Sequence, residues 1–265
     1  MKSHRMYPVL AVLFALLSTS VLGAPRVSTE SGKQTLAVLE LYTSEGCSSC
    51  PPAEKYLKDL STTLGKDKQF IPLAFHVDYW DYIGWEDPFA HVDFSNRQRH
   101  IAQRNELRAI YTPQFVLYGK DFKAYKNIPE AITVINDMNP AADLSVSASL
   151  DSPQQLTTEI ILKSINATSI PHTDMRIFIT ENNLVSNIQD GENAGLEIQH
   201  DYVVRHMTAP FAIEADTKKR QPLSHTIQLD PQWKLTDLNL VVFLQNRQNG
   251  VTLQAVNLPL KELSQ

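Results

Sequence analysis

Residues 36–64 place two cysteines between an apolar run and an amphipathic segment, and this arrangement constrains the fold more than any other stretch. Leu36 to Thr43 is a short apolar run of the kind that forms a buried strand. Cys47-Ser48-Ser49-Cys50-Pro51-Pro52 follows directly. Beyond it, apolar side chains recur at helical spacing and a glycine stands where a helix C-cap belongs: Ala53, Leu57, Leu60, Leu64 and Gly65. The pattern predicts a strand, a turn that carries both cysteines, and a helix.

The two prolines indicate where this helix begins. A proline lacks the backbone N–H, which is tolerated in the first helical turn and costly further in. The residue before a proline is also held away from helical geometry. We therefore expect a short turn through Cys47 and Cys50 and a regular helix from about Pro52.

Cys47 and Cys50 are the only cysteines of the chain. Because they lie so close together in sequence, a role in redox chemistry is favoured over a purely structural cross-link. Closing so small a ring stabilises a fold by only about 2 kcal/mol. At a helix N-terminus, free N–H groups and the helix dipole lower the pKa of a thiol, so an exposed Cys47 is the expected nucleophile. Cys50, one turn on, would resolve a mixed disulfide. A metal clip and an inert disulfide are the alternatives, although a single C-x-x-C is a weak zinc signal.

Residues 1–24 have the features of a signal peptide. Lys2 and Arg5 give a basic start, Val9 to Leu17 is apolar, and small residues follow up to Ala24. The apolar run is shorter than the roughly 20 residues that span a bilayer. No cysteine directly follows it to carry a lipid. We expect a soluble, exported protein, periplasmic or secreted, without a membrane anchor and in a compartment that permits disulfides.

The charge distribution argues against nucleic acid as a partner. The full chain has a formal net charge of −5, and no run of lysine or arginine stands out.

Two regions differ in their periodicity, with a boundary near Asn139-Pro140. Residues 34–139 predict the order β-α-β-α-β-β-α. Its later members are a strand at 70–77, a helix opened by a Ser95/Gln98 capping box, strands at 115–118 and 122–125, and a helix after Pro129. Residues 140–265 show short alternating segments and the hairpin signal Asn249-Gly250, which predict an antiparallel β-sandwich.

The strand–C-x-x-C–helix context resembles that of thioredoxin-fold enzymes. Such enzymes hold a cis proline opposite the cysteines, and the residue before it offers its backbone to a substrate peptide. Thr112-Pro113 stands at the corresponding strand entrance in this sequence. Thioredoxin-like proteins also often carry a buried acid that shuttles the proton of the resolving cysteine. Glu40, in the apolar strand, is the candidate, and an edge position that reaches solvent is the alternative.

Three segments extend the resemblance to a family. They are 39–53 (LELYTSEGCSSCPPA), 76–89 (HVDYWDYIGWEDPF) and 111–114 (YTPQ), together with Arg97-Gln98. The chain resembles the bacterial secreted, thioredoxin-like group known as domain of unknown function 1223. The resemblance implies an α/β thioredoxin-like domain with a C-terminal antiparallel β-sandwich-like extension, and it implies no established reaction.

The aromatic segment 76–89 suggests either core filling or a substrate platform. Trp80 and Trp85, with Tyr111 and Gln114 beside the proline, are the candidate substrate-binding residues. His76 and Asp78 alternate at a strand end and are expected on one face. Cys47, Cys50 and His76 would be the ligands if the site held copper or zinc. Arg97 and Gln98 are expected to hold this segment through one of its aspartates, Asp78, Asp81 or Asp87.

The leading hypothesis is a thiol–disulfide oxidoreductase without a cofactor. Cys47, Cys50, Thr112, Pro113 and Glu40 are its expected catalytic residues. Its partners would be protein or peptide thiols and disulfides, with a separate redox partner that recharges it. The alternatives are a copper chaperone and a non-catalytic protein-binding module built on the β-rich half.

Overall fold

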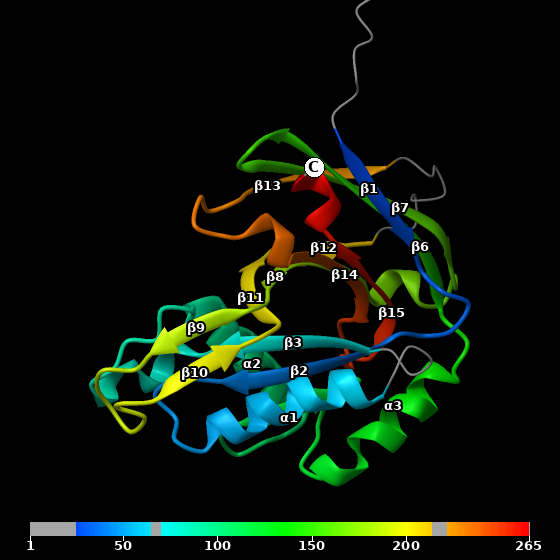
Figure 1. Ribbon diagram of the computed structural model, residues 1–265. Helices are drawn as coiled ribbons and strands as arrows, with labels where there is room; N and C mark the ends of the chain where they lie inside the picture. Colours follow the sequence, from blue (N-terminus) through cyan, green and yellow to red (C-terminus); the bar gives the residue numbers. More distant parts are fainter. Residues whose placement is uncertain (1–24, 65–69, 214–221, 265) are drawn as a thin grey trace, which may run out of the picture.

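The computed structural model describes residues 25–64, 70–213 and 222–264 (Figure 1). The expected signal peptide and Gly65 lie outside the described residues. The chain has a mixed α/β fold that consists mostly of strands, arranged in several sheets. None of the helices in the described part is long and apolar enough to cross a membrane.

The largest sheet runs through the centre of the molecule in the order β15-β14-β8-β11-β3-β2-β4-β5, with β12 attached to β8. Strands β2 and β3 are parallel, β4 is antiparallel to β2, and β11 is parallel to β3. The bounds are β2 Ala37–Thr43, β3 Phe70–His76, β4 Gln114–Leu117, β5 Lys120–Asp121, β8 Thr173–Glu181, β11 Val203–Met207, β12 Phe211–Ala212, β14 Leu238–Asn246 and β15 Thr252–Pro259.

Helices cover both faces of the β2–β3–β4 region of this sheet. The helices are α1 Cys50–Thr63, α2 Val92–Arg104 and α3 Ile128–Asn136. Leu39 and Leu41 pack with α1 and α3, whereas Val38 and Tyr42 share the opposite core with α2. Because side chains of a strand alternate between the two faces, the odd-numbered residues of β2 face α1 and α3 and the even-numbered residues face α2.

A second, four-stranded sheet packs against the other half of the central sheet. Its order is β1-β6-β7-β13, with bounds Arg26–Glu30, Ala142–Ser152, Gln155–Ile165 and Leu223–Gln228. An apolar core lies between it and β8, β14 and β15, to which Val146, Ile160, Ile177 and Leu240 contribute. Strands β9 (Leu184–Asn187) and β10 (Glu197–His200) form a separate hairpin.

The central sheet contains strands from both sides of the predicted boundary near residue 140. Strand β3 pairs with β11 at Ala74 and Val203. Phe178, Val241 and Phe243 then complete the core on the α2 face. The two regions that differ in periodicity are therefore joined through one hydrogen-bonded sheet.

Most predicted elements are confirmed, and several boundaries differ. Helix α1 begins at Cys50, two residues before the predicted start. Helix α2 begins at Val92, with the His91 side chain accepting from the amide of Asp93. The predicted Ser95/Gln98 capping box is wrong, because Ser95 lies inside α2 and its hydroxyl contacts Asp78. The short strand after β4 covers Lys120–Asp121, not residues 122–125.

Candidate functional site

The two cysteines form a disulfide at the junction of β2 and α1. Cys50 is the first residue of α1, and Ser49 occupies the N-cap position. Two turn hydrogen bonds shape the connection: the amide of Cys47 donates to the carbonyl of Ser44 (3.1 Å), and that of Cys50 to the carbonyl of Cys47 (3.1 Å). Prolines occupy the first turn of α1, where no N–H is required. The expected turn through the cysteines is confirmed.

The expectation that Cys47 is exposed is wrong. Cys47 is 2 % exposed and Cys50 is fully buried. The intervening Ser48 and Ser49 are exposed, so solvent reaches the turn but not the sulfur atoms. A segment of the β-rich half contacts the turn, through a residue that lies 146 positions after Cys47 in the chain.

We call residues 184–200 the cap; it consists of β9, β10 and the segment between them (Figure 1). The Asn193 amide donates to the carbonyl oxygens of Glu45 (2.7 Å) and Cys47 (3.2 Å). The amide of Ser48 donates to the Glu192 carboxylate (3.1 Å). Asn193 is itself buried, so these hydrogen bonds hold the cap directly on the cysteine turn.

The Thr112–Pro113 peptide bond is cis, as expected. Gln114 pairs with Tyr42 across β4 and β2, which places this bond near the end of β2 that leads to the cysteines. Trp80 connects the two segments. Its indole N–H donates to the Thr112 hydroxyl (2.7 Å), and a Cβ on Gly46 would lie 3.2 Å from the Cβ of Trp80.

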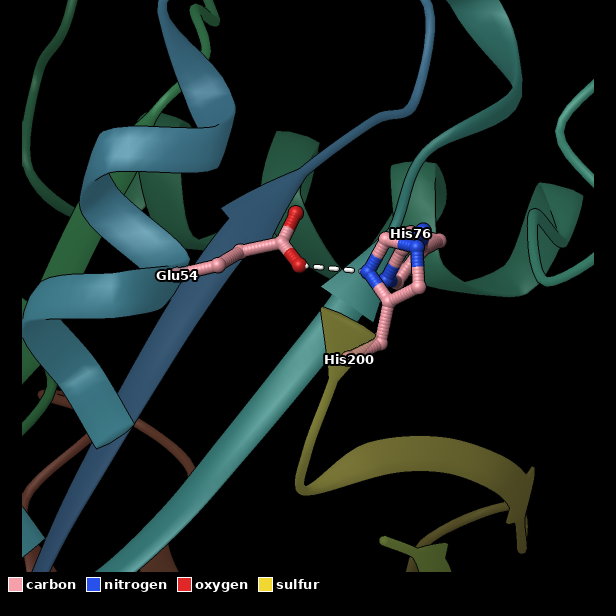
Figure 2. A group of neighbouring side chains, drawn as sticks. All are labelled: Glu54, His76 and His200. Carbon is pink, nitrogen blue, oxygen red and sulfur yellow. Dashed lines mark hydrogen bonds and ion pairs between the residues drawn. The ribbon is translucent and has the colours of Figure 1, made fainter. Parts of the chain in front are cut away.

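A buried cluster of charged side chains adjoins the cysteine turn (Figure 2). Nδ1 of His200 lies 2.6 Å from Oε2 of Glu54, whose other oxygen accepts from the hydroxyl of Thr43 (2.6 Å). Nε2 of His200 lies 3.0 Å from Oε1 of Glu45, a close ion pair that lacks the alignment of a hydrogen bond. The cluster therefore links the cap to α1 and to the cysteine turn.

His76 forms a second pair next to this cluster. Its Nδ1 lies 2.7 Å from Oδ2 of Asp87, which also accepts from the amide of Glu45 (2.8 Å). The rings of His76 and His200 are 5.1 Å apart at an interplanar angle of 75°. Nε2 of His76 is buried and has no hydrogen-bond partner among the described residues.

In this cluster, burial and ion pairing shift the pKa values of the side chains in opposite directions. Burial lowers the pKa of His200, but the close carboxylates of Glu45 and Glu54 outweigh burial and raise this pKa to about 10. Burial raises the pKa of Glu54, yet His200 brings it below the ordinary value. Asp87 behaves likewise, because His76 outweighs the effect of burial and lowers the Asp87 pKa. His200 is thus an imidazolium between two carboxylates at neutral pH.

Glu40 does not lie near Cys50. Its carboxylate accepts two hydrogen bonds from Arg97, at 2.8 and 2.7 Å, and one from the Tyr42 hydroxyl at 2.7 Å. Glu40 has the parity of Val38 and Tyr42, so it faces α2, on the opposite side of the sheet from α1. This position gives Glu40 no direct route for a proton to Cys50. It also shows that the expected pairing of Arg97 with Asp78, Asp81 or Asp87 is wrong.

The candidate substrate-binding residues make contacts within the protein. The Trp85 indole N–H donates to Glu45 (2.6 Å) and the Tyr111 hydroxyl to Asp121 (2.6 Å). Gln114 is fully buried, where it donates to Asp121 and accepts from Gln98. Trp80 and Trp85 are half-buried and brace the cysteine turn.

The expected placement of Asp78 beside His76 is also wrong. Strand β3 ends at His76, and Asp78 begins a 3₁₀ helix, where its amide donates to the Ser95 hydroxyl (3.2 Å).

The side chains that lie close enough together to bind a metal ion are not the predicted ones. Glu54, His76 and His200 each offer a ligand atom, and these atoms lie within 4.8 Å of one another. The predicted alternative of Cys47, Cys50 and His76 lacks free thiolates while the disulfide is intact. Sequence reasoning missed His200 and Asn193, because both are distant in sequence and carry no local motif. Glu54 could have been found from the sequence, because it lies four residues after Cys50 and residues at this spacing share one face of a helix.

These features define a mixed α/β protein, rich in strands, with a capped C-x-x-C disulfide at a helix start. The chain belongs to the family described as "Protein of unknown function (DUF1223)", whose model matches residues 38–245. The family resemblance inferred from the motifs is thereby confirmed.

Two solved structures share the fold. The protein AGR_C_4864 from Agrobacterium tumefaciens is 20 % identical, with a TM-score of 0.58 over 86 % of this chain and 96 % of that one. HBP35 of Porphyromonas gingivalis is 16 % identical, with a TM-score of 0.62 over 87 % of this chain and 76 % of that one. No curated protein matches the chain.

Proposed function

We propose that this protein is an exported thiol–disulfide oxidoreductase that uses Cys47 and Cys50 on protein or peptide thiols. The observation that carries the proposal is the Cys47–Cys50 disulfide at the N-terminus of α1, with the cis Thr112–Pro113 bond on the adjacent strand β4. Export rests on the signal-peptide features of residues 1–24.

A thioredoxin-like arrangement of residues 37–136 supports this proposal. Helix α1 connects the parallel strands β2 and β3, α2 leads to the antiparallel β4 and β5, and α3 follows. The cysteines lie where a strand passes into a helix, and the cis proline begins the neighbouring strand. This combination is the one expected for a redox pair, since the helix start stabilises the thiolate form of a cysteine.

The exchange would transfer two electrons through a mixed disulfide. A substrate thiolate attacks the sulfur of Cys47, the Cys47–Cys50 bond breaks, and Cys50 leaves as a thiolate. A second substrate thiolate then attacks the substrate sulfur of the mixed disulfide, and Cys47 leaves as a thiolate. The substrate is oxidised to a disulfide and the protein is reduced to a dithiol. The reverse sequence reduces a substrate disulfide.

The cap makes access to Cys47 a separate step in this mechanism. Because Cys47 is only 2 % exposed and Asn193 of the cap is hydrogen-bonded to its carbonyl oxygen, we infer that the cap must move before a thiolate can attack the Cys47 sulfur in line. Ser48 and Ser49 already face solvent and mark the side from which a substrate would approach. We infer that opening of the cap limits exchange with large substrates.

Substitution of the cysteines tests the proposed activity. We expect Cys47→Ser to reduce exchange with a peptide dithiol to the background rate, because the attacked sulfur is gone. Cys50→Ser, in which Cys47 is a free thiol, should instead accumulate a mixed disulfide when it is given the oxidised peptide: the Cys47 thiolate attacks the peptide disulfide, and one peptide sulfur leaves as a thiolate. Mass spectrometry under non-reducing conditions would detect this species. Lys55→Ala, at an exposed position of α1, is the control and should keep activity. If the Cys47→Ser variant retained exchange, the proposed function would be wrong.

Asn193→Ala tests the role of the cap. This change removes both hydrogen bonds from the Asn193 amide to the cysteine turn. At about 0.5–1.5 kcal/mol for each bond, the open state gains about 1–3 kcal/mol, which corresponds to roughly 5- to 150-fold in population. We expect reduction of the Cys47–Cys50 disulfide by a small dithiol to become faster by a factor in that range.

Asn187→Ala is the matched control for this cap variant, since Asn187 is an exposed residue of β9. Its reduction rate should equal that of the unchanged protein. An Asn193→Ala rate equal to the wild-type rate would show that the cap does not limit access to Cys47.

A further inference from the structure

We propose that Glu54, His76 and His200 form a binding site for a divalent metal ion of the zinc class, next to the cysteine turn but without a cysteine ligand. The three residues come from three separate elements: Glu54 from α1, His76 from the end of β3, and His200 from the end of β10 (Figure 2). Nothing in the family description or in the names of the similar structures refers to such a site.

The orientation of His76 is the first observation that supports the site. Asp87 accepts the Nδ1 proton of His76, which leaves Nε2 as the atom that faces the other two residues. That nitrogen is fully buried and has no hydrogen-bond partner in the described part of the chain. A buried polar atom without a partner costs about 1–3 kcal/mol, and a bound cation would remove this cost. A carboxylate behind a histidine ligand is the usual outer contact of a metal site.

The charge balance of the cluster is the second observation. Glu45, Glu54 and Asp87 are carboxylates whose ion pairs, among the described residues, are formed with His76 and His200 alone. Even with both imidazoles protonated, three negative charges exceed two positive ones. Excess charge is costly to bury without compensation. With Nε2 of His76 unprotonated, as a metal ligand requires, a divalent cation in place of the proton shared by His200 and Glu54 would lower the excess from two negative charges to one.

The donor set indicates the class of ion. Two imidazoles and a carboxylate are typical of Zn²⁺ and related transition metals, whereas Ca²⁺ and Mg²⁺ prefer sites made of oxygen ligands. Oε1 of Glu45 lies 3.0 Å from Nε2 of His200, across the ring from Glu54, and would orient this imidazole without binding the ion. Thr43 donates to the remaining oxygen of Glu54 and holds that carboxylate in place.

The location gives the ion a structural consequence. Glu54 lies four residues after Cys50, Glu45 lies two before Cys47, and His200 ends the cap. An ion bound by all three ligands would connect the cap to α1 and β3. Metal binding is therefore expected to slow opening of the cap as well as to stabilise the folded protein.

Titration with ZnCl₂ tests the site. The protein should be in its disulfide form, with binding followed by calorimetry and unfolding by thermal melting. We expect one Zn²⁺ per chain and a higher melting temperature with Zn²⁺. Asp87→Asn should weaken binding by about 10- to 100-fold, as expected for a residue that orients a ligand. His76→Gln and His200→Gln should weaken it at least as much, and His100→Gln, an exposed histidine of α2, should bind like the unchanged protein.

Two further measurements distinguish this site from one that uses the cysteines. A Cys47→Ser/Cys50→Ser protein should still bind one Zn²⁺, because no cysteine is a ligand. The absorption spectrum of the unchanged protein with Co²⁺ should show nitrogen and oxygen ligation without thiolate bands, which needs no variant to fold. Binding that is lost in the double cysteine variant but kept in folded His76→Gln would overturn the proposal. So would an absence of binding by the unchanged protein, in which case the cluster is an ion-pair connection only.

Discussion

A chain that ends at residue 139 is expected to lose its cooperative fold. Truncation removes β11, which pairs with β3, and exposes the face of the central sheet that carries Leu73 and Phe75. Phe178 and Phe243, which pack on this face, would be lost with it. Exposing each large apolar side chain costs about 1.5–3 kcal/mol, and several such losses match the ordinary stability of a domain, about 5–15 kcal/mol.

Circular dichroism and thermal melting of the 25–139 fragment would measure this effect. We expect no cooperative transition and exposed apolar surface, whereas the 25–265 chain should melt cooperatively. Removal of residues 264 and 265 is the control, because Ser264 is exposed and the deletion keeps β15 and the buried side chain of Leu263. A cooperatively folded 25–139 fragment with full exchange activity would contradict the expectation. It would support the alternative in which the β-rich half is an independent binding module.

Arg97→Met is expected to lower the free energy of unfolding by about 3–5 kcal/mol, because it leaves the buried carboxylate of Glu40 without its partner. Arg97 is 4 % exposed, donates two hydrogen bonds to Glu40, and lies over the rings of Phe75 and Phe243. Burial lowers the pKa of Arg97, but the negative charge of Glu40 outweighs the effect of burial and raises this pKa. At about 2–4 °C for each kcal/mol, the melting temperature should fall by roughly 6–20 °C.

Replacing the whole polar group tests whether the loss comes from the unpaired charge. A Glu40→Leu/Arg97→Met/Tyr42→Phe protein has neither the carboxylate of Glu40 nor the Tyr42 hydroxyl that donates to it, so no member of this group is left unpaired and most of the stability should return. Arg99→Met, on the exposed face of the same helix, should melt like the unchanged protein. If the triple variant were as unstable as Arg97→Met, apolar packing of the guanidinium would be the cause. Exchange activity of the folded triple variant would also measure any catalytic contribution of Glu40.

Local sequence rules predicted the elements that carry the disulfide. The apolar run 36–43 is β2 and the helical spacing after Cys50 is α1, whereas the cis bond before Pro113 was expected from the resemblance to thioredoxin-fold enzymes. The strand and the helix each depend on neighbours within a few residues: the missing N–H of proline, the alternation along a strand, and the repeat of a helix. The errors at the start of α2 and at β5 are local as well, because they concern only the bounds of these elements. At α2, several polar residues near the helix start could each have formed the cap.

The face on which each side chain lies could be predicted only in part. Strand alternation already separates Glu40 from Leu39 and Leu41, but it does not say which face α1 will cover. Because α1 and α3 pack on the face that carries Leu39 and Leu41, Glu40 faces α2 and meets Arg97. The thioredoxin analogy placed Glu40 beside Cys50, and it failed because it assumed which helix lies over this residue.

By itself the sequence determined the family, the local strand–turn–helix unit and the two residues that form the disulfide, because each depends on chemistry within a short segment. Only the tertiary structure decided that Cys47 is covered, that His200 meets Glu54 and that Asn193 holds the cap. The contacts of His200 and Asn193 join residues that are 146 and 148 positions apart in the chain. Their formation depends on a sheet that brings β11 beside β3, and no local pattern in the chain encodes that pairing.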